Sequence, residues 1–314
     1  MQLAVVIPAY KATYLKETLN SLFEQQVKNF HVYIGDDASP EPIYNIVASF
    51  EGSLQITYRR FDDNLGSKDL TRHWKRCIDM TKDEPWIWLL PDDDVALPEC
   101  VSAFLKACAA DHTHQGLYRF QTSHINAQGQ FICDTPVCPP LESSAAFLIK
   151  KLKFERSSSV AEYIFSKNKY KGIGGFTSLP LAWGSDDWLW LQLSKNNAII
   201  TIPEGRVMLR QSHLNISSNL KNYTQEKFDA KYHFWKLLLK DQLLMHQLEK
   251  IISISEFKRL LSDHLFFEYS SYDLRFLNIN LLLYAQRNSR LLGGGLLKNI
   301  YRLLRYEISK RKWK

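Results

Sequence analysis

The sequence predicts an α/β domain with a largely parallel sheet, followed by a helical region. In the first hundred residues, segments of strand-like and helix-like periodicity alternate, and this order is typical of parallel sheets covered by helices. After about Thr224 the periodicity is helical, with a break at Gly293-Gly294-Gly295. We therefore expect the α/β domain to span residues 1–220 and the helical region to span 221–314.

The expected elements follow one another along the first domain. Strands are expected at 3–7, 30–34, 54–60 and 86–90, and helices at 14–26, 43–50 and 70–80. Beyond Pro98 the pattern predicts a helix at 100–110, a strand at 116–122, a turn at 126–129 and a helix at 144–152. The glycine-rich segment 171–175 is expected to be a loop. After Ala182, two carboxylates stand at the start of an apolar helix, where they favour the helix dipole.

Composition limits the class of protein. The 314 residues are 45% hydrophobic and 13% aromatic, as in a packed globular chain. The apolar start has no charged leader and no small-residue cleavage site, and no window reaches the roughly 18 apolar residues of a membrane span. The five cysteines lack zinc-binding spacing and fit reduced thiols. We therefore expect a cytoplasmic protein.

The net charge of +7 is unevenly distributed, with a basic cluster at the carboxyl end. From residue 298 onward, apolar and basic residues alternate at helical spacing. This pattern fits a helix on an anionic membrane surface, so we expect peripheral membrane contact through 296–314, at the cytoplasmic face of a membrane. The alternative is an ordinary amphipathic helix packed on the body. The basic residues lack an interleaved aromatic groove, which argues against nucleic-acid binding.

Polar groups follow three of the first four expected strands. They are Pro8-Ala9-Tyr10, Asp36-Asp37 and Asp92-Asp93-Asp94. In parallel sheets ligands bind beyond the carboxyl ends of the strands, so these groups predict a binding site. Crowding three carboxylates is costly unless a cation or hydrogen-bond donors neutralise them, which suggests a divalent metal at the triplet. Taken alone, the triplet is better interpreted as a solvated acidic turn than as a metal site.

At this point the sequence resembles a known family, the family 2 glycosyltransferases. The resemblance covers roughly residues 1–220 and rests on five motifs in the expected order. These are the strand ending at Pro8-Ala9-Tyr10 with its following helix, Gly35-Asp36-Asp37-Ala38-Ser39, Asn64-Leu65-Gly66, the Asp triplet, and Ser185-Asp186-Asp187. The resemblance implies a GT-A fold, which is Rossmann-like with a mostly parallel central sheet and flanking helices.

The resemblance also implies a nucleotide-sugar donor, most simply a UDP-sugar. Pro8, Ala9, Tyr10 and Asp37 would hold the nucleobase, because Tyr10 offers an aromatic face and a carboxylate can accept the imide N–H of uracil. The alternative for Asp37 is a turn-forming residue, since Asp-Ala-Ser-Pro is turn chemistry. Arg72 lies between the donor motifs and could meet the diphosphate, or it lies on a solvated helix face.

The metal motif departs from the family pattern, because Pro91 stands where members usually carry the first Asp of Asp-x-Asp-Asp. In this register Asp92 faces the ribose, Asp93 binds Mn²⁺ or Mg²⁺, and Asp94 is a secondary candidate. A second register makes Asp92 and Asp94 the metal pair. His213, in an Arg-x-x-His-like context, is a further candidate for the metal or the phosphate.

Asp187 is the implied general base, which would deprotonate the acceptor hydroxyl. Its neighbour Asp186 is a secondary candidate, and the alternative role of this pair is helix capping. Arg210 is a weaker phosphate candidate. Together these residues predict an inverting, metal-dependent glycosyltransferase that acts on a saccharide acceptor, lipid-linked if the chain works at a membrane, as in cell-surface polysaccharide synthesis.

Two rival classes use the same kind of scaffold. A nucleotidyltransferase should show a glycine-rich basic loop after the first strand, which Pro8-Ala9-Tyr10-Lys11 does not resemble. A non-catalytic protein that binds nucleotide-sugars would be expected to lack the base. The donor sugar, the acceptor and the oligomeric state are not encoded in any motif that we identify.

Overall fold

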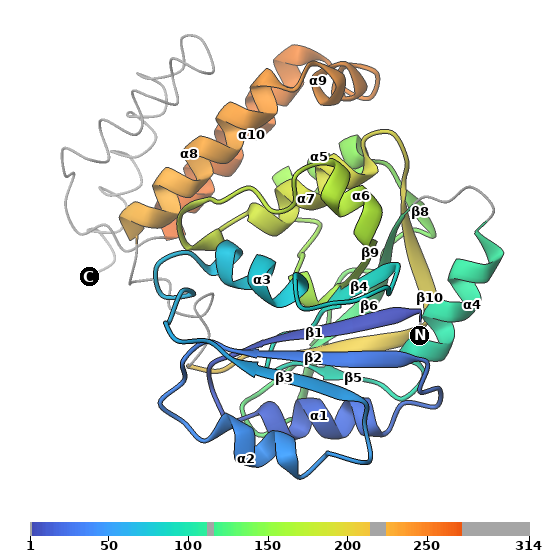
Figure 1. The fold of residues 1–314 in the computed structure, drawn as a ribbon. Helices are drawn as coiled ribbons and strands as arrows, with labels where there is room; N and C mark the ends of the chain where they lie inside the picture. Colours follow the sequence, from blue (N-terminus) through green and yellow to red (C-terminus); the bar gives the residue numbers. More distant parts are fainter. Residues whose placement is uncertain (1, 112–115, 214–223, 272–314) are drawn as a thin grey trace. The chain divides into compact units, whose positions relative to one another are not determined.

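The structure is a computed structural model, which describes residues 2–111, 116–213 and 224–271 (Figure 1). The chain forms two compact units. The first, an α/β unit, contains Met1–Ser144, Ser157–Ser178 and Ser185–His213. The second contains Ala145–Arg156, Leu179–Gly184 and the chain from Leu214 onward, and its described part is mainly helical. Two short segments of the first 220 residues therefore belong to the helical unit.

The first half of the central sheet is parallel and runs β3–β2–β1–β4. These strands are β1 (Leu3–Ala9), β2 (Phe30–Asp36), β3 (Ile56–Arg60) and β4 (Trp86–Leu89). The strand β1 lies in the middle and pairs with β2 from Leu3↔Phe30 to Ala9↔Asp36. Both strands are almost wholly buried, which explains why they appear in the sequence as continuous apolar runs. The carboxyl ends of β1 and β2 thus lie side by side.

The second half is mixed and continues β9–β6–β10–β5. Here β9 (Tyr163–Ser166) is antiparallel to both β4 and β6 (Leu117–Ile125), so β6 and its parallel partner β10 (Ile199–Arg210) point the same way as β1. Three short strands, β5 (Val95–Ala96), β7 (Phe131–Asp134) and β8 (Leu141–Glu142), pair antiparallel to the longer ones. All the long strands except β9 therefore end at one edge.

Helices cover both faces of this sheet (Figure 1). On one face, α1 (Leu15–Phe23), α2 (Ile43–Ala48) and α4 (Cys100–Ala110) share a core with alternate residues of β1, such as Val5 and Ile7. On the other face lie α3 (Leu70–Ile78) and α7 (Ser185–Ser194). The short elements η1 (Val160–Glu162) and α6 (Lys167–Gly172) flank β9.

The expected fold class is confirmed, and most expected elements of the first 152 residues are present within a few residues of their predicted bounds. The helices at 100–110 and 144–152 have the predicted bounds, and the turn at 126–129 joins β6 to β7. The expectation of a largely parallel sheet holds for the first half. The antiparallel strand β9 and the long strand β10 were not predicted, because their sequences lack a continuous strand pattern.

The helical unit contains α5 (Ser144–Leu152), η2 (Pro180–Ala182), α8 (Thr224–Lys240), α9 (Gln242–Glu249) and α10 (Ile254–Ser271). Within it, the His264 ring of α10 stacks on Phe154 at 4.6 Å between ring centroids. Among the helices of the described residues, none is both long and apolar enough to cross a bilayer. The basic segment 296–314 and its expected membrane helix lie outside the described residues.

Candidate active site

The loop after β1 is joined to the loop after β4 by a single carboxylate. The backbone amides of Tyr10 and Lys11 both donate to Oδ2 of Asp92, at 2.8 and 2.9 Å. On its other side, the carbonyl of Tyr10 accepts a 2.5 Å hydrogen bond from the Ser39 hydroxyl, which follows β2. The Tyr10 ring itself is 38% exposed. Three loops from three neighbouring strands are thus tied together, with one aromatic ring left accessible.

Pro8 and Ala9, the other predicted base-binding residues, are the last two residues of β1. They pair with Gly35 and Asp36 of β2. Asp36 is fully buried, and its carboxylate accepts from the Ser39 amide at 2.8 Å, the Tyr58 hydroxyl at 2.6 Å and the Arg60 guanidinium at 2.8 Å. The carboxylate of Asp36 thus connects the loop after β2 to β3.

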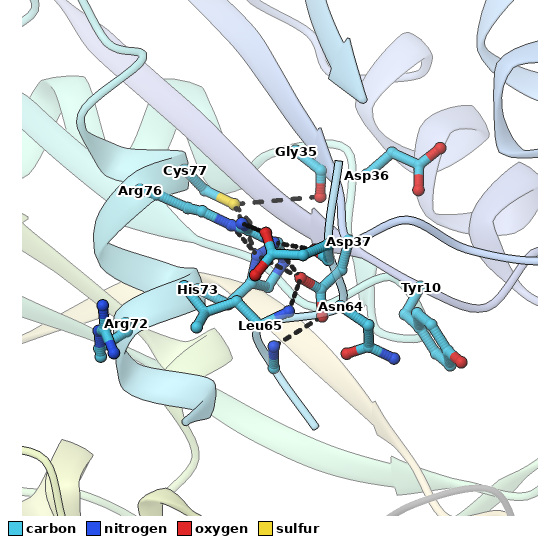
Figure 2. A network of polar contacts seen from close by, with 12 residues as sticks. Tyr10, Gly35, Asp36, Asp37, Asn64, Leu65, Arg72, His73, Arg76 and Cys77 are labelled. Carbon is cyan, nitrogen blue, oxygen red and sulfur yellow. Dashed lines mark hydrogen bonds and ion pairs between the residues drawn. The ribbon is translucent and has the colours of Figure 1, made fainter. Parts of the chain in front are cut away.

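Asp37 lies at the centre of a polar network (Figure 2). Its carboxylate accepts hydrogen bonds from the backbone amides of Leu65 at 3.0 Å and Gly66 at 2.8 Å. The Arg76 guanidinium and Nδ1 of His73, both from α3, contact the same carboxylate, the latter at 3.1 Å. Gly66 is required here, because a Cβ at that position would lie 2.6 Å from Oδ2 of Asp37. Asp37 therefore orders the loop that carries Asn64-Leu65-Gly66.

The two residues of α3 that contact Asp37, Arg76 and His73, differ in charge. Arg76 also donates to the Asp63 carboxylate at 2.7 Å and lies 3.9 Å from the centroid of the Phe61 ring. Burial lowers the pKa of His73 to about 4, although the nearby Asp37 carboxylate acts in the opposite direction. His73 is therefore neutral at pH 7, and its Nδ1 accepts a 3.1 Å hydrogen bond from Nε of Arg76.

The three carboxylates after β4 have three different environments. Asp92 bonds to the loop after β1, as described above. Oδ1 of Asp94, which is 5% exposed, accepts from the backbone amide of Arg210 at 2.9 Å. The carboxylate of Asp93 accepts no hydrogen bond from another residue in the described part of the chain, and burial together with the adjacent Asp92 charge raises its pKa to about 6. Burial raises the pKa of all three carboxylates, but Asp93 is the one whose side chain accepts no hydrogen bond from another described residue.

Arg210, the last residue of β10, is held among protein groups. Its Nε donates to the carbonyl of Asp93 at 2.9 Å, and a terminal nitrogen contacts the Glu17 carboxylate at 2.5 Å. The guanidinium also lies over the Tyr14 ring, 4.3 Å from its centroid. These contacts fix the backbone of the triplet and leave Arg210 2% exposed. The expected phosphate role of Arg210 stays a prediction, and the observed contacts favour a structural one.

The acidic pair of α7 is directed toward the same edge of the sheet. Asp186 and Asp187 occupy the first turn of this helix. One turn later, Trp190 stacks on Tyr163 at 4.2 Å, and Tyr163 is the residue of β9 nearest the edge at which β4 and β6 end. Because β10 follows α7 after only four residues, α7 runs back along the sheet, about 15 Å long. Its amino-terminal turn therefore lies toward the edge that carries the other carboxylates.

Two predicted residues lie at the surface. Arg72 is exposed on α3, and its backbone amide donates to the helix-capping Asp69 carboxylate at 3.1 Å. In Figure 2 its side chain is directed away from the Asp37 network. His213 is exposed three residues beyond the end of β10, at the limit of the described segment.

Sequence reasoning missed His73 and Arg76, the partners of Asp37. A signal was available: α3 has its apolar face at Trp74, Cys77 and Ile78, and His73 interrupts that buried face with a polar ring. A polar residue on the buried side of an amphipathic helix needs a partner. What the sequence does not show is that the partner follows β2, more than 35 residues earlier.

A divalent metal fits these residues only together with a ligand. In residues 2–111, 116–213 and 224–271, no group of three or more His, Cys, Asp or Glu side chains converges as in a protein-only metal site. Asp93 offers one carboxylate that burial and the Asp92 charge make hard to ionise, and a cation would relieve that cost. Mg²⁺-type ions are commonly bound by one or two carboxylates plus phosphate oxygens and water. The donor set therefore suits a metal that arrives with a diphosphate.

Residues 4–127 match the sequence model of the family described as Glycosyl transferase family 2. This match covers β1 to β6, including the Asp37 network and the Asp triplet. This segment of the chain is therefore similar to family 2 glycosyltransferases. A Haemophilus influenzae protein described as an uncharacterized glycosyltransferase is 23% identical over 177 residues, which span 56% of each of the two proteins. The chain thus spans about half the length of that relative.

Solved structures agree on the fold. Residues 1–349 of S. aureus TarS in complex with UDP-GlcNAc superpose with a TM-score of 0.73 at 15% identity, and the match covers 100% of this chain and 93% of that one. GalNAc-T7 with UDP, GalNAc and Mn²⁺ superposes with a TM-score of 0.53 at 12% identity over 84% of this chain and 54% of the other. The chain therefore has the GT-A fold that its sequence predicts.

Proposed function

We propose that this glycosyltransferase transfers a sugar from a UDP-sugar to a hydroxyl group of a saccharide acceptor, with inversion at the anomeric carbon. The observation that carries the proposal is the joining of three loops at one edge of the sheet. Asp92 ties the loop after β4 to the loop after β1, and Ser39 ties the latter to the loop after β2. Such an edge binds nucleotides in α/β folds, and the similar TarS structure holds UDP-GlcNAc.

The donor would lie along these joined loops. The exposed Tyr10 ring would stack on the nucleobase, beside the chain of Pro8 and Ala9. Asp37 orders the loop of Asn64-Leu65-Gly66 and keeps acceptor capacity on Oδ2 for a base N–H, because a carboxylate oxygen accepts two hydrogen bonds. Oδ1 of Asp92 would meet the ribose, while Oδ2 holds the loop. Arg72 is a diphosphate contact only if its exposed side chain turns toward the donor.

Asp93 would hold Mn²⁺ or Mg²⁺, with His213 as a second ligand or a phosphate contact. When bound, such an ion stabilises the negative charge on the departing nucleotide diphosphate. Asp94 would act indirectly, because its contact with the Arg210 amide fixes the backbone next to Asp93. Arg210 supports the same backbone through the carbonyl of Asp93. The protein thus supplies one well-placed carboxylate, and phosphate and water complete the coordination.

Asp187 would act as the general base. It would take the proton of the acceptor hydroxyl as that oxygen bonds to the anomeric carbon and the bond to the nucleotide diphosphate breaks. Asp186, in the same helical turn, would cap the helix or orient the acceptor. The proposal thus assigns one base and one metal-binding carboxylate, which are the two groups that a single displacement uses.

The acceptor context rests on the sequence alone. A basic amphipathic segment at 296–314 suggests a lipid-linked saccharide at the cytoplasmic face of a membrane, as in cell-surface polysaccharide synthesis. Flotation with anionic liposomes of the full chain and of a chain shortened before residue 296 tests this point. Equal flotation of the two proteins would remove the membrane part of the proposal.

The central experiment is a donor screen that begins with UDP-GlcNAc and measures release of nucleotide diphosphate, with Mn²⁺ and with chelator. We expect release from one UDP-sugar, with loss of turnover but not of donor binding in Asp187→Asn. Asp186→Asn is the matched control. Release of pyrophosphate from a parallel reaction that supplies uridine triphosphate and a sugar 1-phosphate would indicate a nucleotidyltransferase instead. Donor binding without any release, across all UDP-sugars, would indicate a non-catalytic binding protein.

A further inference from the structure

The turn that precedes the acidic pair has an unusual backbone. Within Leu179–Gly184, the φ angles of Leu181, Ala182 and Gly184 are +57°, +56° and +83°. Only glycine adopts such angles readily, so Leu181 and Ala182 hold a conformation that L-residues disfavour. The turn is closed by two backbone hydrogen bonds, Ala182 to Leu179 at 2.8 Å and Trp183 to Pro180 at 3.0 Å. Strain of this kind persists only where surrounding structure enforces it.

The surrounding structure is α8. The fully buried Lys227 places its ammonium 4.6 Å from the centroid of the Trp183 ring. About two helical turns later, Phe234 also faces the turn. A Cβ added to Gly184 would lie 3.4 Å from its ring, at contact distance. The turn belongs to the helical unit, although the chain on both sides of it, up to Ser178 and from Ser185, belongs to the α/β unit. A strained turn of one unit therefore leads directly into the first residue of α7.

We propose that α8 is a positioning element for Asp187, and that Lys227 and Phe234 hold the strained turn whose end sets the start of α7. The proposal rests on the proposed role of Asp187 as general base. Only two residues, Ser185 and Asp186, separate Gly184 from Asp187, so the direction in which the turn ends fixes the position of the carboxylate. A base must reach the reacting hydroxyl within hydrogen-bond distance, and a displacement of about 1 Å can cost about 100-fold in rate.

Lys227→Ala tests this proposal in the full-length protein, with Lys236→Ala, an exposed lysine on the same helix, as the matched control. With UDP-GlcNAc, or the UDP-sugar that the donor screen returns, we expect kcat to fall at least tenfold. The KM for the donor should stay within twofold of the wild-type value, because the donor loops are untouched. The control should keep both values.

A second substitution separates positioning from simple loss of packing. Ala182→Gly removes the penalty for positive φ at that residue. Added to Lys227→Ala, it should recover most of the lost kcat, since the turn then needs less support. Unchanged kcat in Lys227→Ala would overturn the proposal, as would a lost kcat that Ala182→Gly does not restore. Absence of transfer by the wild-type protein would instead contradict the proposed function itself.

Discussion

Two acidic segments follow β2 and β4, the parallel strands on either side of β1, and their surroundings differ. After β2, Asp36 and Asp37 are both buried, and each contacts an arginine and at least one backbone amide. After β4, the carboxylates of Asp92 and Asp94 accept from backbone amides, while the carboxylate of Asp93 accepts from no other residue in the part of the chain that the structure describes. In the first segment, an arginine balances the charge of each carboxylate. In the second, the carboxylate of Asp93 has no hydrogen-bond donor among the other described residues.

The difference indicates where a ligand is needed. Carboxylates that already contact cations hold the fold, and their removal should be felt as lost stability. A carboxylate whose pKa is raised by burial and by a like charge stores unfavourable electrostatic energy that a bound cation can release. Asp36 and Asp37 therefore shape the site, and Asp93 is the better candidate for chemistry.

The largest expected effect is at Asp93. Asp93→Asn should lower transfer by at least about 100-fold, as expected when electrostatic stabilisation of the leaving group is lost. Because the substitution removes a charge that the fold does not compensate, the Tm measured with chelator should be unchanged or higher. A fall in Tm of several degrees would show that Asp93 stabilises the fold, as Asp36 and Asp37 do, and would contradict the proposed difference between the two segments.

Asp36→Asn should show the opposite pattern. Removing the charge leaves Arg60 and the Tyr58 hydroxyl without their ionic partner, and we expect a loss of about 2 kcal/mol in the free energy of unfolding. Chemical denaturation of this variant beside the wild type gives the value. Full stability combined with lost donor binding would show that Asp36 belongs to the donor site instead.

Acid should weaken the Asp37 network through His73. The folded pKa of about 4 lies below the ordinary 6.5, so the unfolded chain binds the proton more tightly. The stability contributed by neutral His73 is complete above pH 6.5 and is lost toward pH 4, by up to about 1.4 kcal/mol per pH unit. The stability difference between wild type and His73→Gln should therefore shrink as the pH falls. A difference that is constant from pH 7 to 4 would contradict the lowered pKa.

The smallest effect is expected from Arg60→Gln. This side chain is 51% exposed, and Asp36 keeps its bonds to Ser39 and Tyr58. Since exposed ion pairs contribute little, the Tm should fall by no more than about 2 °C. A larger fall in Tm would mean that the Asp36 carboxylate is stabilised more by Arg60 than by the Ser39 amide and the Tyr58 hydroxyl.

The first half of the sheet could be predicted because its information is local. The strands β1, β2 and β4 are short, mainly apolar runs, and polar residues follow them directly. The strand β10 could not be predicted in the same way. Pro203, Glu204 and Gly205 interrupt its pattern, and the structure accommodates them with an irregularity between Ile202 and Arg206 and a φ of +83° at Gly205.

The residues of the candidate site show the same difference between local and long-range information. Its carboxylates were identified from their positions after strands and from the family resemblance. Their partners were not, because contacts such as the Arg210 amide with Asp94 join residues that lie 116 positions apart. Nor does the sequence reveal which aspartates of the triplet accept hydrogen bonds from the protein itself. That depends on loops that meet only after the sheet has formed.

The carboxylate of Asp92 also provides a means of observation. Its Oδ2 accepts from two consecutive amides, Tyr10 and Lys11, that are more than 80 positions away in the sequence. Any change in the electron density of that oxygen, whether from a proton, an ion or a ribose hydroxyl on the same carboxylate, must alter the magnetic environment of both amide protons. In a ¹⁵N-labelled sample, these two resonances would report occupancy of the site without a probe attached to ligand or protein.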